Sequence, residues 1–405
     1  MVYQEITYLI TITTIEKMKK KNVSIYALML GFLLSLAACS EDKGESLEQT
    51  AAGESFICIE QIIDGCIDIA TEVGETKIGD PLDKWNAGLK TEALYAVESW
   101  YSWHSREDYS NNIYSIRNAY YGSRNGEVSS VSLAALIGKN NASLDKQVRE
   151  AISETIEAIL DIPQPFRNNI GSTEASNAQQ QCANLTEVLT QLKGYIEQTG
   201  AVNQDEVLDP IIASYVDNVV LPTYAELKEK NNQLYLAAKA FRDAPSDAAF
   251  DDVCDAWMAA RSPWETSEAF LFGPVDNEGL DPNMDSWPLD QDAIVRILNS
   301  GDFDQMDWSD GDNDDAIKAK QEVRGFHTLE FLIFRNGVPR TLSDVSTSND
   351  AADLVYTASN AKSWANYMTQ VAYLLQKDAA NLYDYWATSY KGGESYAQRF
   401  KSHKI

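Results

Sequence analysis

The sequence predicts an all-α protein. After the first 45 residues, nearly every long segment places apolar residues three or four positions apart, which is the repeat that gathers them on one helix face. Sustained apolar–polar alternation, the pattern typical of strands, is absent from the sequence. A length of 405 residues exceeds what one hydrophobic core usually organises, so we expect two domains.

The N-terminal region predicts export and a lipid anchor. Lysines at 19–21 precede an apolar run at 25–38, which is the order of a secretory signal and too short to span a bilayer. Leu36-Ala37-Ala38-Cys39 resembles a bacterial lipobox, so we expect residues 1–39 to be a signal peptide that starts at Met18 and Cys39 to be lipidated. The acidic stretch that follows resembles a surface-export signal. We therefore expect a protein anchored in the outer membrane, facing the periplasm or the cell surface.

Apolar spacing and loop-forming residues divide the rest of the chain. Helices are expected at 144–160, 185–196, 211–241 with a break at Pro222, and 364–390. Irregular segments are expected at 162–165, 200–205, 273–288 and 300–315. The expected parts are a tether and first helix at 40–75, one helical bundle at 76–203 and a second at 204–405.

Charge and cysteine content exclude some functions. The formal net charge of −28 repels phosphate backbones, so nucleic-acid binding is not expected, whereas cation binding is compatible with it. Cys58, Cys66, Cys182 and Cys254 allow three disulfide pairings in an exported protein, but each also suits a small buried position. No Cys-x-x-Cys occurs, which argues against a thiolate zinc site.

The segment at 325–330 carries the strongest chemical signal. Asp314-Asp315 offers a helix start and Asn336-Gly337 a helix end, so we expect one helix between them. On that helix His327 and Glu330 are three positions apart and share a face, where they could hold a metal or orient one another. Gly325 inside a helix costs about 1 kcal/mol relative to Ala, which predicts a close approach of another helix or a ligand there.

Gly325-Phe326-His327-Thr328-Leu329-Glu330 resembles the Gly-x-His-x-x-Glu signature of the imelysin family. Further segments resemble this family over roughly residues 90–400, namely 111–122 with its Ile-Arg-Asn, Pro163-Gln164-Pro165-Phe166, 260–263, 267–270, 272–274 and 285–290. The half with Ile-Arg-Asn usually follows the half with Gly-x-His-x-x-Glu, so the chain resembles a circularly permuted member. Ser110–Ile113 stands where the family has Asp-Asn-Thr-His.

The resemblance implies two four-helix bundles with a functional site between them and a link to bacterial iron uptake. It implies that one group of residues faces another across that interface, namely His327, Glu330, Arg261, Glu268 and Trp287 on one side with Asn112 and Arg117 on the other. Gly325 of the motif is expected among the binding residues as well. His327 and Glu330 are then the expected metal ligands or orienting groups. Arg117 and Arg261 are expected to hold anions or carboxylates, and Glu268 to add an oxygen ligand.

The resulting prediction is an envelope lipoprotein that binds iron, another divalent metal or a haem-like ligand. Uptake proteins of the outer membrane are its expected partners. The family also carries a peptidase label. A catalytic zinc needs about three protein ligands, and the chain offers only His104, His327 and His403 and no His-Glu-x-x-His. A buried pair that merely joins two helices is the remaining alternative for His327 and Glu330.

Two other features have simpler interpretations. Asp310-x-Asp312-x-Asp314 resembles the start of a calcium loop, but Asp315 replaces the glycine and Gln321 the final glutamate, so a solvated acidic loop is expected. An aromatic cluster could line a ligand pocket or stack on a haem, although aromatic residues at helical spacing are usually core. Its members are Trp100, Tyr101, Trp103, Tyr109, Tyr120 and Tyr121.

Overall fold

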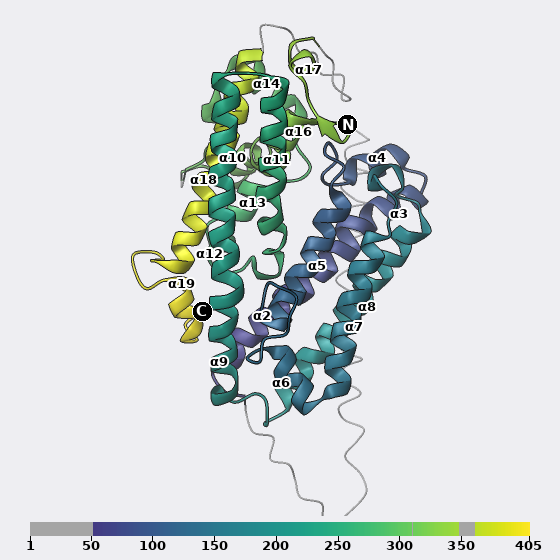
Figure 1. Cartoon of the computed structure of the whole chain (residues 1–405), viewed down its shortest axis with the longest axis vertical. Coiled ribbons are helices and arrows are strands. Elements are labelled where there is room, and N and C mark those ends of the chain that lie inside the picture. Colours follow the sequence, from purple (N-terminus) through teal and green to yellow (C-terminus); the bar gives the residue numbers. More distant parts are fainter. Residues whose placement is uncertain (1–51, 310, 348–360) are drawn as a thin grey trace, which may run out of the picture. The chain divides into compact units, whose positions relative to one another are not determined.

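Helices dominate the structure, which confirms the all-α prediction. The computed structural model describes residues 52–309, 311–347 and 361–405 (Figure 1). The signal segment and Cys39 lie outside these residues. In the described ranges, no helix combines the length and the apolar character that crossing a membrane requires.

The helices are α2 (Phe56–Glu72), α3 (Asp80–Asn86), α4 (Lys90–Ala96), α5 (Ser105–Tyr121), α6 (Leu133–Asn140), α7 (Ala142–Leu160), α8 (Thr173–Gln198), α9 (Asp205–Tyr215), α10 (Leu221–Asp243), α11 (Asp247–Glu265), α12 (Pro274–Asn277), α13 (Leu280–Asp285), α14 (Gln291–Ser300), α15 (Asp314–Gln321), α16 (Gly325–Ile333), α17 (Leu342–Thr347), α18 (Ala361–Ala387) and α19 (Tyr396–Lys401). Two π-helical segments, η1 (Val73–Gly79) and η3 (Val216–Val220), and three short 3₁₀ turns, η2 (Phe166–Asn168), η4 (Glu268–Phe270) and η5 (Phe303–Met306), join them. The strands are β1 (Phe334–Arg335) and β2 (Val338–Pro339).

Local sequence explains where several helices begin and which face each one buries. Six helices begin with a capping side chain whose oxygen accepts a hydrogen bond from a backbone N–H of the first turn. For α6, α7, α8, α11, α14 and α15 these capping residues are, in order, Ser132, Asn141, Ser172, Ser246, Asp290 and Asn313. On α7 the predicted apolar face is buried, including Val148, Ile152 and Ile159. Burial of such faces is what stabilises helices of this length in water.

The helices pack mainly with neighbours from the same half of the chain. In the first half α7 packs on α8 and α5, and α8 packs on α2; in the second half α10 packs on α11 and α18, and α16 on α18 (Figure 1). Contacts of α5 with α11 and η4, and of α2 with η4 and α9, join the two groups, and residues 49–405 form one compact unit. The expected boundary at 200–205 is the turn between α8 and α9.

The expected break at Pro222 is wrong. The chain passes from α9 through the π-helical η3 into α10 without a loop, and Pro222 lies in the first turn of α10. The π-helical turn η3 directly precedes Pro222 and already interrupts the α-helical hydrogen-bond pattern, so the missing N–H of proline is accommodated without a break in the chain direction. The segment 273–288 is also more ordered than expected, since it contains α12 and α13.

The single helix expected between Asp314 and Asn336 is also wrong. Helix α15 ends at Gln321, the backbone is extended at Arg324, and α16 begins at Gly325 with a φ of +86°. Asn336 and Gly337 have φ values of +54° and +78° and form the turn of the β1–β2 hairpin. Two successive residues with positive φ are typical of a tight hairpin turn and do not continue or cap a helix.

All four cysteines outside the signal region are buried and free. Burial raises the pKa of the Cys58 thiol to about 12 and raises the pKa of the other three as well. They act here as small buried hydrophobic side chains, the second of the two roles that the sequence allowed.

Candidate functional site

Gly325 sets the position of the segment that carries His327 and Glu330. A Cβ atom at Gly325 would lie 2.5 Å from the carbonyl oxygen of Met284 and 2.8 Å from its carbonyl carbon. Together with the positive φ, this contact excludes every residue except glycine. The close approach predicted from the sequence is confirmed, and the neighbour is the backbone of α13. It brings the start of α16 beside Asp285, the last residue of α13.

His327 and Glu330 form a buried pair. The Nδ1 atom of His327 lies 2.9 Å from Glu330 Oε2, and both side chains are almost fully buried. The other oxygen, Glu330 Oε1, accepts hydrogen bonds from the backbone N–H groups of Tyr101 at 3.1 Å and Ser102 at 2.8 Å, and from the Ser102 hydroxyl at 2.6 Å. The loop before α5 thus uses the remaining acceptor capacity of Glu330.

The second ring nitrogen of His327 also has partners. Its Nε2 atom lies 3.2 Å from Asp285 Oδ1 and 3.4 Å from an Arg261 nitrogen. Burial and the Arg261 charge favour neutral imidazole, but the charge of Asp285 and the hydrogen bonds to Asp285 and Glu330 outweigh them and raise the pKa of His327 to about 9. The charged ring donates from both nitrogens and cannot ligate a metal in this state. In this arrangement His327 and Glu330 orient one another, and His327 also contacts Asp285, which fits the orienting role that the sequence allowed beside the metal-ligand role.

Arg261 of α11 holds carboxylates from three elements. It forms ion pairs with Asp285, with Glu265 at 2.6 Å and with Asp108 of α5 at 3.4 Å. Arg261 is 1% exposed, so these contacts lie in a low-dielectric interior where a bare guanidinium would be costly. The predicted role of Arg261 as a carboxylate partner agrees with these contacts. Arg261 and His327 also keep the pKa of Asp285 well below its usual range, against the opposing effect of burial.

The two residues expected on the opposite side differ in position. Asn112 belongs to the cluster, because its Nδ2 atom donates to Glu265 Oε2 at 2.5 Å. Arg117 does not, which corrects the expectation that it faces His327. Its guanidinium lies over Tyr114 and donates to Asn118 on the same helix. Asn112 and Arg117 are five positions apart and project about 140° apart around the helix axis, so they cannot share one face.

Trp287 and Glu268 complete the predicted set. The rings of Trp287 and His327 meet edge to face, with centroids 5.1 Å apart. Glu268 in η4 is 7% exposed, and the described residues offer its carboxylate no hydrogen bond or ion pair within normal distance. Glu268 is thus a buried carboxylate that lacks a close partner.

Three carboxylates converge at this point of the structure. Oxygen atoms of Glu265, Glu268 and Asp285, one from each residue, lie within 4.8 Å of one another. We call these three residues the acidic triad. Glu265 and Asp285 were not among the residues predicted from the sequence. Asp285 lies within a segment that resembles the family, and Glu265 is three positions before Glu268. Neither observation reveals that α13 ends beside α11, which is what brings the three carboxylates together.

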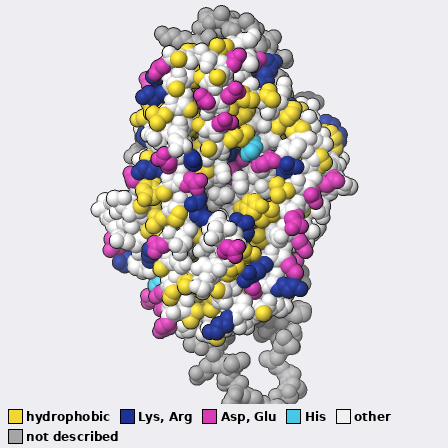
Figure 2. Space-filling model, in the orientation of Figure 1, with side chains coloured by type: hydrophobic (Ala, Val, Ile, Leu, Met, Phe, Trp, Pro, Cys, Tyr) yellow, Lys and Arg dark blue, Asp and Glu magenta, His cyan; other side chains and the backbone are white. Residues whose placement is uncertain are grey.

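A cavity of about 490 Å³ opens beside the acidic triad. Its charged lining is mostly acidic, and comprises Glu72, Glu98, Glu268, Asp281, Asp285 and Glu322 with Lys77 and Lys318. Lys77 is buried and lies 3.2 Å from Glu98 and 3.7 Å from Glu72. Acidic and basic side chains are interspersed on the face shown in Figure 2, without a continuous basic patch there.

Burial of so many carboxylates changes their protonation. Desolvation raises the pKa of Glu265 to about 8, because it outweighs the opposing charge of Arg261. Desolvation together with the neighbouring carboxylates Asp285 and Glu72 raises the pKa of Asp281 to about 7. The pKa of Glu268 is raised well above its usual range for the same reason, despite the nearby charge of Lys77. Protons therefore occupy part of this cluster near neutral pH.

The remaining predictions concern other features. Trp100 and Tyr101 line a second cavity, whereas Tyr109 and Tyr120 are core residues. His104 is partly buried at the start of α5, with its ring against Trp257. In the acidic loop, Asp310 lies outside the described residues.

Comparisons with known proteins agree with this architecture. The sequence profile of the imelysin family (peptidase M75) matches residues 37–192 and 220–404. The crystal structure of an imelysin peptidase from Bacteroides ovatus superimposes with a TM-score of 0.70, is 55% identical, and is matched over 74% of this chain and 84% of that one. The chain is 33% identical to iron-regulated protein A of Synechococcus elongatus over 139 residues, which is 34% of this chain. It thus spans about a third, 35%, of the length of that relative.

The two stretches matched by the profile include most helices of both packing groups, and they contain the acidic triad, the His327–Glu330 pair and Arg261. Because the match extends over far more than half of the sequence, the chain belongs to the imelysin family.

Proposed function

We propose that this chain binds a metal cation, iron foremost, at the acidic triad and serves iron uptake at the cell envelope. The observation that carries the proposal is the convergence of Glu265, Glu268 and Asp285 beside an acidic cavity. A cation there would replace the protons that the carboxylates otherwise hold. Metal binding and proton release are coupled in this way whenever the ligands must be deprotonated.

Charge balance supports the proposal. Arg261 and Lys77 are buried bases close to the acidic triad. Arg261 pairs with two triad members, Glu265 and Asp285, and with Asp108, whereas Lys77 pairs with Glu98 and Glu72. Glu268 keeps no close partner among the described residues although it is more than nine-tenths buried. A buried carboxylate without a hydrogen bond is costly unless it is protonated or meets a cation. A metal ion in the cavity would supply that cation.

The donor set favours hard cations. All three ligand groups are carboxylates, and oxygen ligands suit hard ions, whereas catalytic zinc sites use imidazole or thiolate in most proteins. Glutamates projecting from facing helices also hold iron in helical bundles. The name of the relative in Synechococcus, iron-regulated protein A, is consistent with iron. The geometry gives less support to a metallopeptidase, because both nitrogens of His327 are engaged.

His327 and Glu330 would act through Asp285. Glu330 is held by the loop at Tyr101 and Ser102, and it orients the His327 ring, whose Nε2–H then donates to Asp285. A ligand carboxylate held by a second group is a common arrangement at metal sites, and loss of the supporting group typically costs 10–100-fold in affinity. The motif that resembles the family signature would thus position a ligand and not supply one.

The envelope location is part of the same proposal. Its support is the lipobox-like sequence at 36–39 after an apolar run, from which we infer an outer-membrane lipoprotein with Cys39 as the anchored residue. The order of the segments that resemble the family supports a circularly permuted arrangement, which proteins tolerate when the parental termini lie close together at the surface. Uptake partners in the outer membrane follow from this location.

Metal analysis of the purified protein tests the site. Chelator-treated protein is incubated with ferric or ferrous iron, desalted and measured by mass spectrometry, alongside Glu268→Gln and the control Glu154→Gln, whose side chain is exposed on α7. We expect near-stoichiometric iron in the wild type and the control, and at least about tenfold weaker binding in Glu268→Gln. Equal iron content in all three proteins, or none in any, would refute the proposed site.

A further inference from the structure

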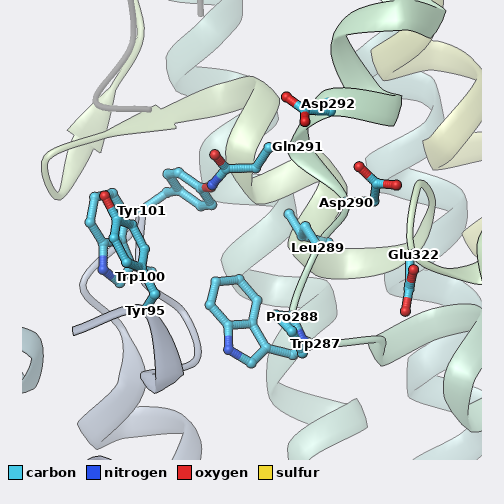
Figure 3. A pocket seen from close by; sticks show the side chains of 10 residues that line it. All are labelled: Tyr95, Trp100, Tyr101, Trp287, Pro288, Leu289, Asp290, Gln291, Asp292 and Glu322. Carbon is cyan, nitrogen blue, oxygen red and sulfur yellow. The ribbon is translucent and has the colours of Figure 1, made fainter. Parts of the chain in front are cut away.

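A second cavity, of about 590 Å³, lies next to the acidic one and has a different character (Figure 3). Its lining residues are Tyr95, Trp100, Tyr101, Trp287, Pro288, Leu289, Asp290, Gln291, Asp292 and Glu322. Figure 3 shows Tyr95, Trp100 and Tyr101 together on one side and the three carboxylates on the other. We propose that this aromatic cavity binds a small organic cation, of the ammonium or quaternary ammonium class.

The aromatic side is a connected set of rings. Tyr95 stacks on Trp100 with centroids 5.7 Å apart, and Trp100 meets Tyr101 edge to face at 5.1 Å. Tyr101 in turn meets Trp287 at 6.5 Å with an interplanar angle of 72°. Aromatic faces carry partial negative charge and attract cations, and pockets of several rings are how proteins recognise quaternary ammonium groups.

The opposite side adds formal negative charge. Asp290, Asp292 and Glu322 line it, and no lysine or arginine is part of the described lining. Arg296 lies 3.9 Å from Asp290 and Lys318 lies 3.8 Å from Glu322, and these two bases are 66% and 75% exposed. Exposed pairs of this kind are weak, so a cation inside the cavity meets carboxylates that are little neutralised. On the aromatic side, the Arg167 guanidinium lies over the Trp100 ring, 3.7 Å from its centroid.

Several hydrogen bonds hold the two sides in place. Gln291 Nε2 donates to the Tyr101 hydroxyl, which ties the start of α14 to the aromatic side. Asp290 N donates to the backbone oxygen of Glu322 at 3.3 Å, and Asp290 Oδ1 accepts from Ala293 N at 2.9 Å. The wall is thus built from residues that are already fixed, and little ordering cost remains for a ligand.

Size and charge define the ligand class. A volume of this magnitude suits a small organic molecule, and the combination of rings and carboxylates selects a positive group with an apolar surface. Neutral sugars also stack on aromatic rings, but they gain no charge attraction from three carboxylates that exposed bases neutralise only weakly. The described site therefore favours a cation over a neutral ring.

This site is separate from the proposed metal site, although the two cavities share Trp287, Pro288 and Glu322. The acidic triad does not line the aromatic cavity. Binding of an organic cation is therefore expected in chelator-treated protein and in Glu268→Gln, so the outcome does not depend on whether the metal proposal holds.

Calorimetric titration of the full chain, treated with chelator, tests the proposal with three probes. These are choline, its neutral carbon isostere dimethylbutanol, and glucose. We expect choline to bind at least about fivefold more tightly than dimethylbutanol, because only choline carries the charge, and we expect no binding of glucose. Tighter binding of glucose would identify a carbohydrate site, and equal binding of choline and dimethylbutanol would identify a merely apolar pocket; either result would overturn the proposal.

Matched variants locate the site. Tyr95→Leu removes a half-exposed ring of the aromatic side, and Asp292→Asn removes one exposed carboxylate; each is expected to weaken choline binding about fivefold. Tyr373→Leu on α18 and Asp251→Asn on α11 remove the same groups elsewhere on the surface and are expected to leave choline binding unchanged. No choline binding to the wild type, or equal loss in the control variants, would contradict this location.

Discussion

Asp285 and His327 lie 3.2 Å apart, carboxylate oxygen to imidazole nitrogen, and this contact joins the last residue of α13 to the first turn of α16. The contact depends on Gly325, whose missing side chain allows the two segments to approach. It couples the residue pair visible in the sequence to the carboxylates that the sequence left unassigned.

Replacing the buried histidine is expected to destabilise the fold. His327→Ala removes the positive partner of Glu330 and leaves a buried carboxylate uncompensated, so we expect a loss of about 3–5 kcal/mol in the free energy of unfolding. Denaturant titration measures it. His403→Ala is the control, because its contact with Asp209 is at the surface and contributes less than about 1 kcal/mol. Similar losses in the two variants would contradict the role given to His327.

Gly325→Ala is expected to disrupt the junction of α13 and α16. The new Cβ would require both a strained positive φ and displacement of the Met284 backbone, which together cost at least about 2 kcal/mol. Gly194→Ala in the interior of α8 is the matched control, because the nearest atom to its Cβ would be 4.0 Å away. There we expect unchanged or slightly increased stability, by up to about 1 kcal/mol. Thermal unfolding of the two variants compares them directly, and a stable Gly325→Ala protein would refute the packing argument.

The metal-free protein is expected to lose stability as pH rises from about 6.5 to 9. The folded state raises the pKa of His327 from 6.5 to about 9, so the stability gained from its protonated form is complete below 6.5 and lost by 9. Burial raises the pKa of Glu265 from 4.5 to about 8, so its deprotonation in the folded state becomes costly across 4.5 to 8. Both effects have the same sign and amount to a few kcal/mol.

Denaturant titrations of chelator-treated protein at several pH values measure this loss. Glu265→Gln has no carboxyl group to titrate at that position, so its stability should fall less steeply between pH 6.5 and 8 than that of the wild type. Stability that stays constant or increases over the full interval would show that these groups do not have the protonation states inferred from their burial.

Metal binding is expected to release protons. Glu265 and Glu268 are partly protonated near neutral pH because burial raises the pKa of each, and a cation at the acidic triad requires both as carboxylates. Calorimetry at pH 7 in two buffers of different ionisation enthalpy measures the number of protons released. We expect about one or more per metal bound and an affinity that increases from pH 6 to 8. Binding without proton release would place the metal elsewhere.

Much of the helical framework is determined locally. The three-to-four spacing of Val148, Ile152 and Ile159 predicts α7 almost to its ends, because burial of one face requires that spacing in any packed helix. The same local argument places His327 and Glu330 on one face and marks Gly325 as a point of close contact. It fails at Pro222 and at Asn336. At these residues the local sequence is compatible with more than one backbone conformation, and contacts with distant segments decide which one forms.

The sequence by itself determined the helices, the pairing of His327 with Glu330 and an acidic, cation-compatible composition. Only the tertiary structure decided which groups share a cavity: it placed Asp285 and Glu265 beside Glu268, moved Arg117 out of the cluster and used both nitrogens of His327. The physical reason is that sequence patterns constrain only residues that are close together along the chain. Helical spacing constrains neighbours within a turn or two, whereas the approach of α13 to α11 and α16 depends on packing between segments tens of residues apart, which no local pattern encodes.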